Sequence, residues 1–110
     1  MILRKDMDWS KMYKIHLKPE VDKAFKKIAR KNKNQLKIVH KKILEIQNDP
    51  NHKYKFLRKP LQNINRVHID KHFVLLFKIN HKKKYVEIQL YKHHDEIYKW
   101  TIINNQMNKK

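Results

Sequence analysis

The residues most capable of chemistry lie near the end of the chain, where Lys92, His93, His94, Asp95 and Tyr98 follow one another closely. Imidazole side chains can accept and donate protons near neutral pH. A lysine ammonium can hold a phosphate group, and a carboxylate can orient an imidazole. Together these side chains could bind a phosphodiester and move protons beside it without a metal ion.

A second pair of polar residues, Arg66 and His68, lies earlier in the chain. Both alternate with apolar residues, as side chains do in a strand that buries one face. The planar guanidinium of Arg66 suits the bidentate geometry of phosphate oxygens. This pair is therefore a candidate for the same kind of site.

The chain as a whole is strongly basic, with 28 Lys and Arg against 10 Asp and Glu and a formal net charge of +18 over 110 residues. A biased, AT-rich genome could supply the lysines, but it does not explain why acidic residues are so few. A solvated, self-repelling surface is the alternative interpretation. We expect a polyanionic ligand, nucleic acid or the ribosome, and an acidic protein partner is compatible with it. Histidines on such a chain indicate a small nuclease or a toxin directed against nucleic acid.

Two consecutive helices are predicted, over residues 19–31 and 34–48. Pro19 stands where a helix can begin, and Asn48, Asp49 and Pro50 end the second helix. The first helix has apolar residues at helical spacing, namely Val21, Ala24, Phe25 and Ile28.

Four strands are predicted, one before the helices and three after them, over residues 12–17, 65–70, 73–79 and 85–91. The order strand, helix, helix, strand, strand, strand predicts an α+β fold. In this fold a two-helix hairpin packs on one face of a small, mostly antiparallel four-stranded sheet. Arg66 and His68 would then lie on the other face, which needs a ligand or a partner to explain it.

The chain is expected to be one domain over residues 12–100, with an N-terminal extension at 1–11 and a C-terminal tail at 101–110. It has no Cys, and hence no disulfide and no thiolate zinc site. No apolar run approaches the roughly 20 residues of a membrane span, and residues 1–11 lack the apolar core of a signal peptide. We therefore expect a soluble protein of the cytoplasm with no membrane partner.

The order of elements, together with residues 66–69, 73–77 and 91–98, resembles the RelE/ParE superfamily of toxin–antitoxin toxins, nearest to the RelE and YafQ mRNA interferases. The resemblance implies an enzyme, a metal-independent endoribonuclease that needs no cofactor. Such toxins enter the A site of the small ribosomal subunit and cut messenger RNA by attack of the ribose 2′-hydroxyl on the adjacent phosphate. It also implies a cognate antitoxin, acidic and partly disordered, that folds on the basic surface.

The YafQ-like pattern provides one set of candidate residues. His68, and His94 with Tyr98, match the active-site histidines and C-terminal aromatic residue of that group. His72 and Phe73 stand where YafQ-like members carry Asp and Trp.

The RelE pattern provides an overlapping set. Arg66, His68 and Tyr98 align with it, and Lys92 stands in for its C-terminal Arg. The third-strand Arg of RelE is missing, because Val74 lies there. This departure favours the histidine-based variant of the mechanism.

Cleavage of RNA by its own 2′-hydroxyl needs a base, cations that stabilise the extra charge on phosphorus, and an acid for the leaving 5′-oxygen. We assign His68 and His94 as the acid–base pair, with the direction undetermined, and Arg66 and Lys92 as phosphate clamps. Tyr98 would orient the 2′-hydroxyl, stack on a base, or simply pack against the core.

Four further residues are secondary candidates, namely His72, Phe73, His93 and Asp95. His93 would lie on the strand face opposite His94, Asp95 would orient a histidine or cap a helix, and His72 would be a turn residue. The remaining histidines are dispersed and are interpreted as surface or satisfied residues, namely His16, His40, His52 and His81.

No metal site is expected. His68 and His72 are four residues apart, but that spacing joins ligands on a helix, and this segment is predicted as strand and turn. The adjacent His93 and His94 would diverge in a strand.

Two other functions remain open. ParE-like relatives share the architecture but inhibit DNA gyrase and are not nucleases, and the histidines argue against this alternative. The chain could also be an inactive family member that only binds RNA, in which case alanine at His94 would change neither growth inhibition nor RNA binding.

Overall fold

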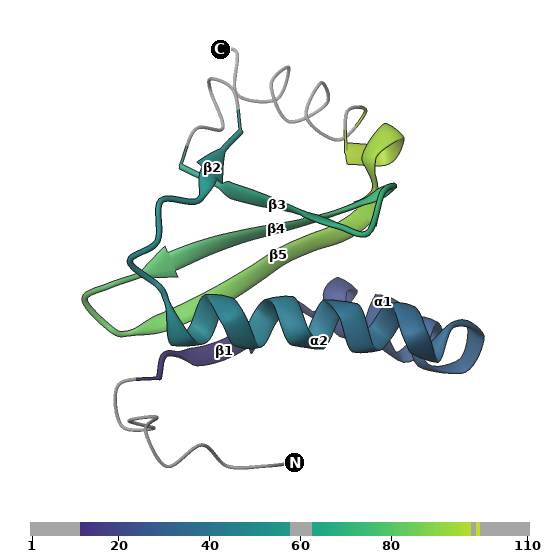
Figure 1. Cartoon of the computed structure of the whole chain (residues 1–110), viewed down its shortest axis with the longest axis horizontal. Helices are drawn as coiled ribbons and strands as arrows, with labels where there is room; N and C mark the ends of the chain where they lie inside the picture. The colour runs from purple at the N-terminus through teal and green to yellow at the C-terminus, as the bar shows by residue number, and fades with distance from the viewer. Residues whose placement is uncertain (1–11, 58–62, 98, 100–110) are drawn as a thin grey trace.

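The computed structural model describes residues 12–57, 63–97 and 99. The chain forms, in order, β1 (Lys14–Leu17), α1 (Pro19–Lys31), α2 (Lys33–Asn48), β2 (Lys55–Phe56), β3 (Asn65–Ile69), β4 (Phe73–Asn80) and β5 (Tyr85–His93). The two helices lie together on one side of the sheet (Figure 1). The predicted α+β fold is confirmed. The segments predicted as an extension (1–11) and a tail (101–110) lie outside the described residues.

Both helices begin where the sequence predicts, to within one residue. α1 starts with Pro19 in its first turn, has acidic residues in that turn and basic residues in its last turn, and so complements the helix dipole. The Asn32 side chain caps α2 by accepting a hydrogen bond of 3.0 Å from the backbone N–H of Gln35. No helix in the described part of the chain is long and apolar enough to cross a membrane.

The sheet has five strands in the order β1-β5-β4-β3-β2. β1 pairs parallel with β5 and the other pairs are antiparallel, so the sheet is mostly antiparallel as predicted. The predicted count of four strands was wrong by one, because β2 was missed. β2 has only two residues and both side chains are exposed, so it carries no alternating pattern to detect.

The sheet is apolar on both faces. On the helix side it contributes to the main core with residues such as Ile69, Phe77 and Ile88, which are fully buried with Val39 and Ile46 of α2. The other face carries a smaller apolar cluster, namely Leu57, Ile64, Val74, Leu76, Leu90 and Ile97. β4 contributes to both clusters, which explains its nearly continuous apolar sequence. We call the face away from the helices the open face.

Candidate nucleic-acid site at the end of the sheet

Arg66 and His68 lie on the open face of β3, because their neighbours Val67 and Ile69 pack into the core on the helix side. Strand register aligns each of them with one residue on β4 and one on β5. Arg66 pairs with Leu76, which pairs with Leu90, and His68 pairs with Val74, which pairs with Lys92. Val74, Leu76 and Leu90 are buried on this face, and the side chains of Arg66, His68 and Lys92 lie beside them, exposed or partly exposed.

Register also sets the scale of this surface. His68 and Lys92 lie in one row, two strands apart, so that their Cα atoms are separated by roughly 10 Å at the usual strand spacing. His68 and Lys92 are exposed, and Arg66 is partly exposed. None of the three side chains has a hydrogen bond or ion pair to another described residue, so their donors are available to a ligand.

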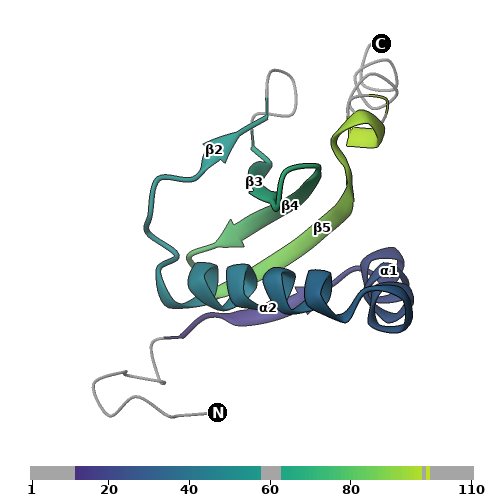
Figure 2. The same ribbon diagram turned by 45° about the vertical axis from the view of Figure 1, so that its right-hand side comes forward.

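His94 lies opposite His72 at the end of the sheet. The last β4–β5 register pair joins Phe73 and His93, and one further backbone bond runs from the N–H of His94 to the carbonyl of His72, at 2.8 Å. Residues 94–97 then form a helical turn that stands beyond the sheet, away from α1 and α2 (Figure 2). This turn places His94 beside His72, where β4 begins and β5 ends.

Asp95 orients His94. The carboxylate Oδ1 of Asp95 lies 2.8 Å from Nδ1 of His94, so that a proton on Nδ1 leaves the lone pair of Nε2 free. Both side chains are exposed, about half for His94 and 72% for Asp95, so the pair fixes the ring more than it stabilises the fold. Of the two roles open to Asp95, the structure favours that of an orienting residue. Nδ1 of His93 instead accepts the backbone N–H of Asp95, at 3.2 Å, as an N-cap side chain does.

Three histidine rings meet at this edge. The rings of His93 and His94 have centroids 4.4 Å apart, and that of His72 lies 5.8 Å from His93 and 6.2 Å from His94. The expectation that His93 and His94 diverge was wrong. The strand ends at His93 and the chain turns into a helix at His94, so the two side chains no longer point to opposite faces.

Phe73 packs as a support for this cluster. Its ring stacks on Tyr91 at 5.3 Å and meets His93 edge to face at 5.6 Å, and it packs against the helix-side core. Phe73 thus lies behind the histidines. Tyr98, the proposed aromatic partner of His94, lies outside the described residues.

The dispersed histidines have local partners, as interpreted from the sequence. His16 stacks on Tyr85 and His40 meets Phe25 edge to face. Nδ1 of His81 lies 3.0 Å from the hydroxyl of Tyr13.

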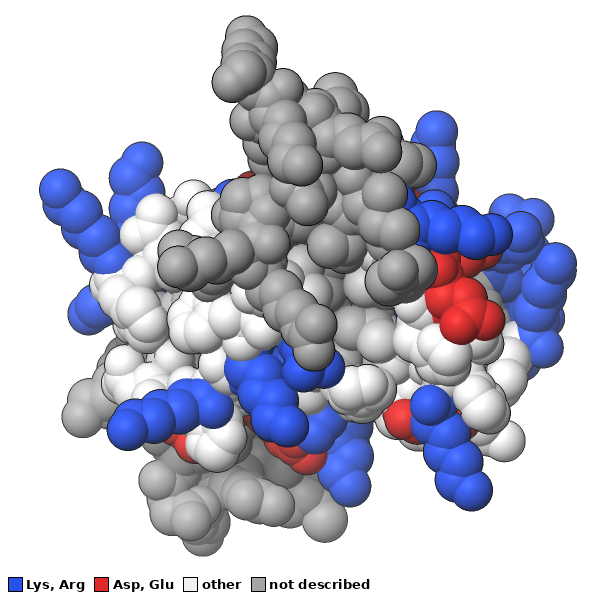
Figure 3. Space-filling model, turned by 90° about the horizontal axis from the view of Figure 1, so that it is seen from above, with Lys and Arg blue, Asp and Glu red and all other residues white. Residues whose placement is uncertain are grey.

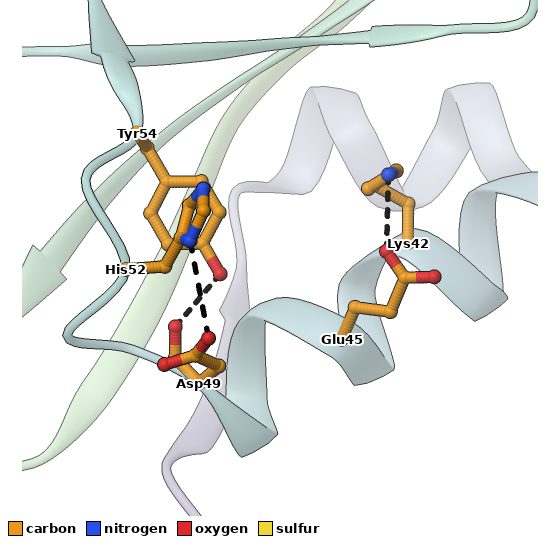
Figure 4. A network of polar contacts seen from close by, with 5 residues as sticks. All are labelled: Lys42, Glu45, Asp49, His52 and Tyr54. Carbon is orange, nitrogen blue, oxygen red and sulfur yellow. Dashed lines mark hydrogen bonds and ion pairs between the residues drawn. The ribbon is translucent and has the colours of Figure 1, made fainter.

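His52 belongs to a polar network at the end of α2 (Figure 4). Its Nδ1 lies 3.9 Å from the carboxylate of Asp49, and the hydroxyl of Tyr54 donates to the carbonyl of Asp49 at 2.7 Å. Burial, with the charges of Asp49 and Glu45, raises the pKa of Tyr54 to about 12. A hollow beside this network is lined in part by Tyr54 and Phe56. No periodic pattern in the sequence predicts this hollow, because much of its lining comes from the loop between α2 and β2.

Basic side chains surround the molecule when it is seen from above, with a small acidic patch among them (Figure 3). On α1 the basic residues form a continuous surface, namely Lys23, Lys26, Lys27, Arg30 and Lys31. Of these, Lys26 is paired with Asp22 at 3.1 Å. The charge of the chain is thus spread over several faces. It is not confined to the end of the sheet where His72, His93 and His94 lie, which we call the histidine edge.

Comparison with known proteins identifies two relatives that align with this chain over nearly their whole length. An uncharacterized protein of Methanosarcina mazei is 47% identical over 87 residues, which cover 79% of this chain and all of the relative. A protein of Methanocaldococcus jannaschii named "Putative toxin RelE4" is 46% identical over 88 residues, covering 80% of this chain and 93% of the relative. No protein-family model matches the chain.

Two solved structures share the fold. One is the toxin–antitoxin complex RelBE2 from Mycobacterium tuberculosis, with a TM-score of 0.63, 18% identity, and coverage of 80% of this chain and 97% of the matched chain. The other is the YoeB–YefM complex from Staphylococcus aureus, with a TM-score of 0.63, 17% identity, and coverage of 74% and 97%. At these identities the likeness concerns the architecture, two helices on one face of a mostly antiparallel sheet.

Proposed function

Because the chain belongs to the RelE superfamily of toxins, we propose that it is the toxin of a toxin–antitoxin system and acts as a metal-independent endoribonuclease on ribosome-bound messenger RNA. Residues 12–100 would be the toxin domain, with 1–11 and 101–110 as accessory segments. Its place of action would be the cytoplasm, where translating ribosomes are found.

One observation carries the proposal. Arg66, His68 and Lys92 face outward from one side of the sheet and have no hydrogen bond or ion pair with any residue that the structure describes, and His94 follows β5 with its Nδ1 beside the carboxylate of Asp95. Single exposed charges are common on protein surfaces, so the proposal depends on the combination of two cations and an imidazole on one side of the sheet in a chain that belongs to a toxin family. Exposed cations and an imidazole suit the oxygens and the proton transfers of a phosphodiester.

The proposed reaction uses each group once. One of His68 and His94 removes the proton of the ribose 2′-hydroxyl, and the 2′-oxygen forms a bond to the adjacent phosphorus. The bond from phosphorus to the 5′-oxygen breaks, and the other histidine donates a proton to that oxygen. The products are a 2′,3′-cyclic phosphate and a 5′-hydroxyl. Arg66 and Lys92 would stabilise the charge that accumulates on the phosphate oxygens.

The roughly 10 Å between the Cα atoms of His68 and Lys92 matters for this scheme. It is wider than a single phosphate group, so one histidine and one cation would approach the phosphate from each side. His94 and Asp95 would form a pair in which the carboxylate stabilises the imidazolium when the ring is protonated. Tyr98 would orient the 2′-hydroxyl or stack on a base.

The partners would be messenger RNA, the ribosomal RNA of the A site, and an antitoxin. Two of the solved structures that share the fold, RelBE2 and YoeB–YefM, are toxin–antitoxin complexes, which supports a protein partner for this chain. With a net charge of +18, that antitoxin would be acidic, and it would fold from a partly disordered state on the basic surface.

The test is cleavage of a messenger RNA on programmed ribosomes in the presence of EDTA. Wild-type protein is expected to cut, and His68→Ala and His94→Ala are each expected to lower the rate by about 10²–10⁴-fold. His52→Ala is the matched control, because it removes an exposed imidazole far from the open face and should retain activity. If wild-type protein cuts neither on ribosomes nor free RNA, the nuclease proposal fails, and inhibition of gyrase supercoiling becomes the next assay.

A further inference from the structure

The histidine edge has a property that RNA cleavage does not require. One nitrogen from each of His72, His93 and His94 lies within 4.8 Å of the other two. The proposed acid–base pair uses only His94 of this cluster, together with His68, and two further imidazoles beside His94 bring together groups that repel one another when protonated. Neutral imidazole is, however, the commonest protein ligand of transition metals.

The cluster is held together before any ligand binds. His72 lies in the turn before β4, and His93 and His94 lie at the end of β5. The backbone bond of 2.8 Å from His94 to the carbonyl of His72 joins these two segments. The rings of His72 and His93 are stacked in parallel, with an angle of 4° between their planes.

The spacing can be compared with that of a zinc site. Zn–N bonds of about 2.0–2.1 Å in a tetrahedron place the ligand nitrogens roughly 3.4 Å apart. The widest separation here would have to shorten by about 1.4 Å. His72 and His94 are exposed and His93 is only partly buried, so their rings have room to rotate toward a shared ion.

Asp95 provides the outer contacts that such sites use. Its carboxylate lies 2.8 Å from Nδ1 of His94, whereas Nδ1 of His93 accepts the backbone N–H of Asp95. A carboxylate on the far nitrogen of a metal-bound imidazole fixes the ring and strengthens the ligand. Its negative charge also offsets part of the repulsion between a divalent cation and the nearby ammonium of Lys92.

We propose that His72, His93 and His94 bind a zinc ion, with a water molecule in the fourth position, and that zinc inhibits the nuclease. Inhibition follows because the Nε2 lone pair of His94 cannot bind a metal and a proton at once. The inhibitory half of this proposal rests on the proposed function, whereas zinc binding does not.

Binding is tested first, by calorimetric titration of the untagged, metal-free full chain with zinc chloride. Wild-type protein is expected to bind one zinc ion, and His93→Ala and His72→Asn are each expected to weaken binding at least tenfold. His68→Ala and His52→Ala are controls. Each removes a histidine that lies outside the cluster, so each should bind zinc as tightly as the wild type does. Wild-type affinity in both cluster variants would overturn the site, as would the absence of zinc binding by the wild type. Circular dichroism of each variant establishes that it is folded.

A second readout identifies the ligands. Cobalt(II) in place of zinc gives intense visible absorption in a tetrahedral site and weak absorption in an octahedral one. The intense form is expected with wild-type protein and should be lost in His72→Asn. An unchanged spectrum in that variant would exclude His72 as a ligand.

Regulation is tested by titrating zinc into the cleavage assay without EDTA. The wild-type rate should fall in proportion to zinc occupancy and return when EDTA is added. For His93→Ala, the zinc concentration that halves the variant's own rate should rise at least tenfold. Stimulation by zinc, or equal inhibition of both proteins, would contradict the inhibitory role. Failure of the nuclease itself would leave the calorimetric result standing, so the two proposals can fail separately.

Discussion

At the scale of single residues, the Asp95–His94 contact most directly links geometry to rate. Nδ1 of His94 lies 2.8 Å from the carboxylate, whose side chain is 72% exposed. Asp95→Asn keeps the shape but removes the charge that stabilises the imidazolium. Because solvent screens this pair, we expect a loss of about tenfold in the single-turnover cleavage rate, well below the loss for a buried pair.

Glu96→Gln is the matched control for Asp95→Asn, since it removes the same charge one residue further along the chain. It should leave the rate within about twofold of wild type, because Glu96 contacts neither histidine. An equal loss in both variants would mean that the local negative charge matters and the contact to His94 does not.

At the scale of elements, one buried hydrogen bond fastens α2 to the strand that ends in the histidine edge. Nε2 of Gln35 donates to the hydroxyl of Tyr91 at 2.7 Å, and both residues are buried. Tyr91→Phe leaves the amide without this acceptor and should lower the free energy of unfolding by about 1–3 kcal/mol in urea titrations. Tyr85→Phe, which removes a longer contact to Asn80 at 3.4 Å, should cost less. Equal losses would show that the buried bond contributes nothing particular.

The polar network at the end of α2 should make the stability of the fold depend on pH in the alkaline range. Burial and the charges of Asp49 and Glu45 raise the pKa of Tyr54 from 10.0 to about 12 in the folded chain. Above pH 10 the unfolded chain loses this proton first, so the contribution of Tyr54 to stability is complete below pH 10 and is lost as the pH rises toward 12. Thermal unfolding from pH 9 to 12 should show a smaller decline for Tyr54→Phe than for wild type. Parallel curves would contradict the assignment.

The positions of most helices and strands could be predicted from the sequence, because they depend on local patterns. Pro19 marks the start of α1, and the alternation of Arg66 and His68 with apolar residues places them on the open face. Register could not be predicted, so the alignment of His68 with Lys92 came only with the structure. The convergence of His93 with His94 depends on where β5 ends. No periodic pattern marks that point, because the strand runs two residues further than its apolar pattern suggests.

At the scale of the whole molecule, the charge of +18 should make RNA binding strongly dependent on salt. Each phosphate contact on a single strand adds about 0.7 to the slope of log affinity against log salt. Replacing the exposed and unpaired Lys27 and Arg30 of α1 by Ala should therefore lower the slope by about 1.4 if this face binds RNA.

The control for the α1 double variant is a second double variant, Lys82→Ala with Lys83→Ala. It also removes two exposed charges, from the turn between β4 and β5. An equal decrease in both double variants would show that net charge alone governs the affinity. No decrease in the α1 variant would exclude that face from the interface. Fluorescence anisotropy with a labelled RNA at several salt concentrations provides both slopes.

The central claim is that the chain cuts RNA by means of the RNA's own 2′-hydroxyl, without a metal ion. The most direct measurement uses a ribosome-bound message in EDTA, with and without a single 2′-deoxynucleotide immediately 5′ to the mapped cut. We expect cleavage of the ribose message, with a 2′,3′-cyclic phosphate and a 5′-hydroxyl at the new ends, and no cleavage at the deoxy position. Cleavage that persists at the deoxy position, or that stops in EDTA, would contradict it.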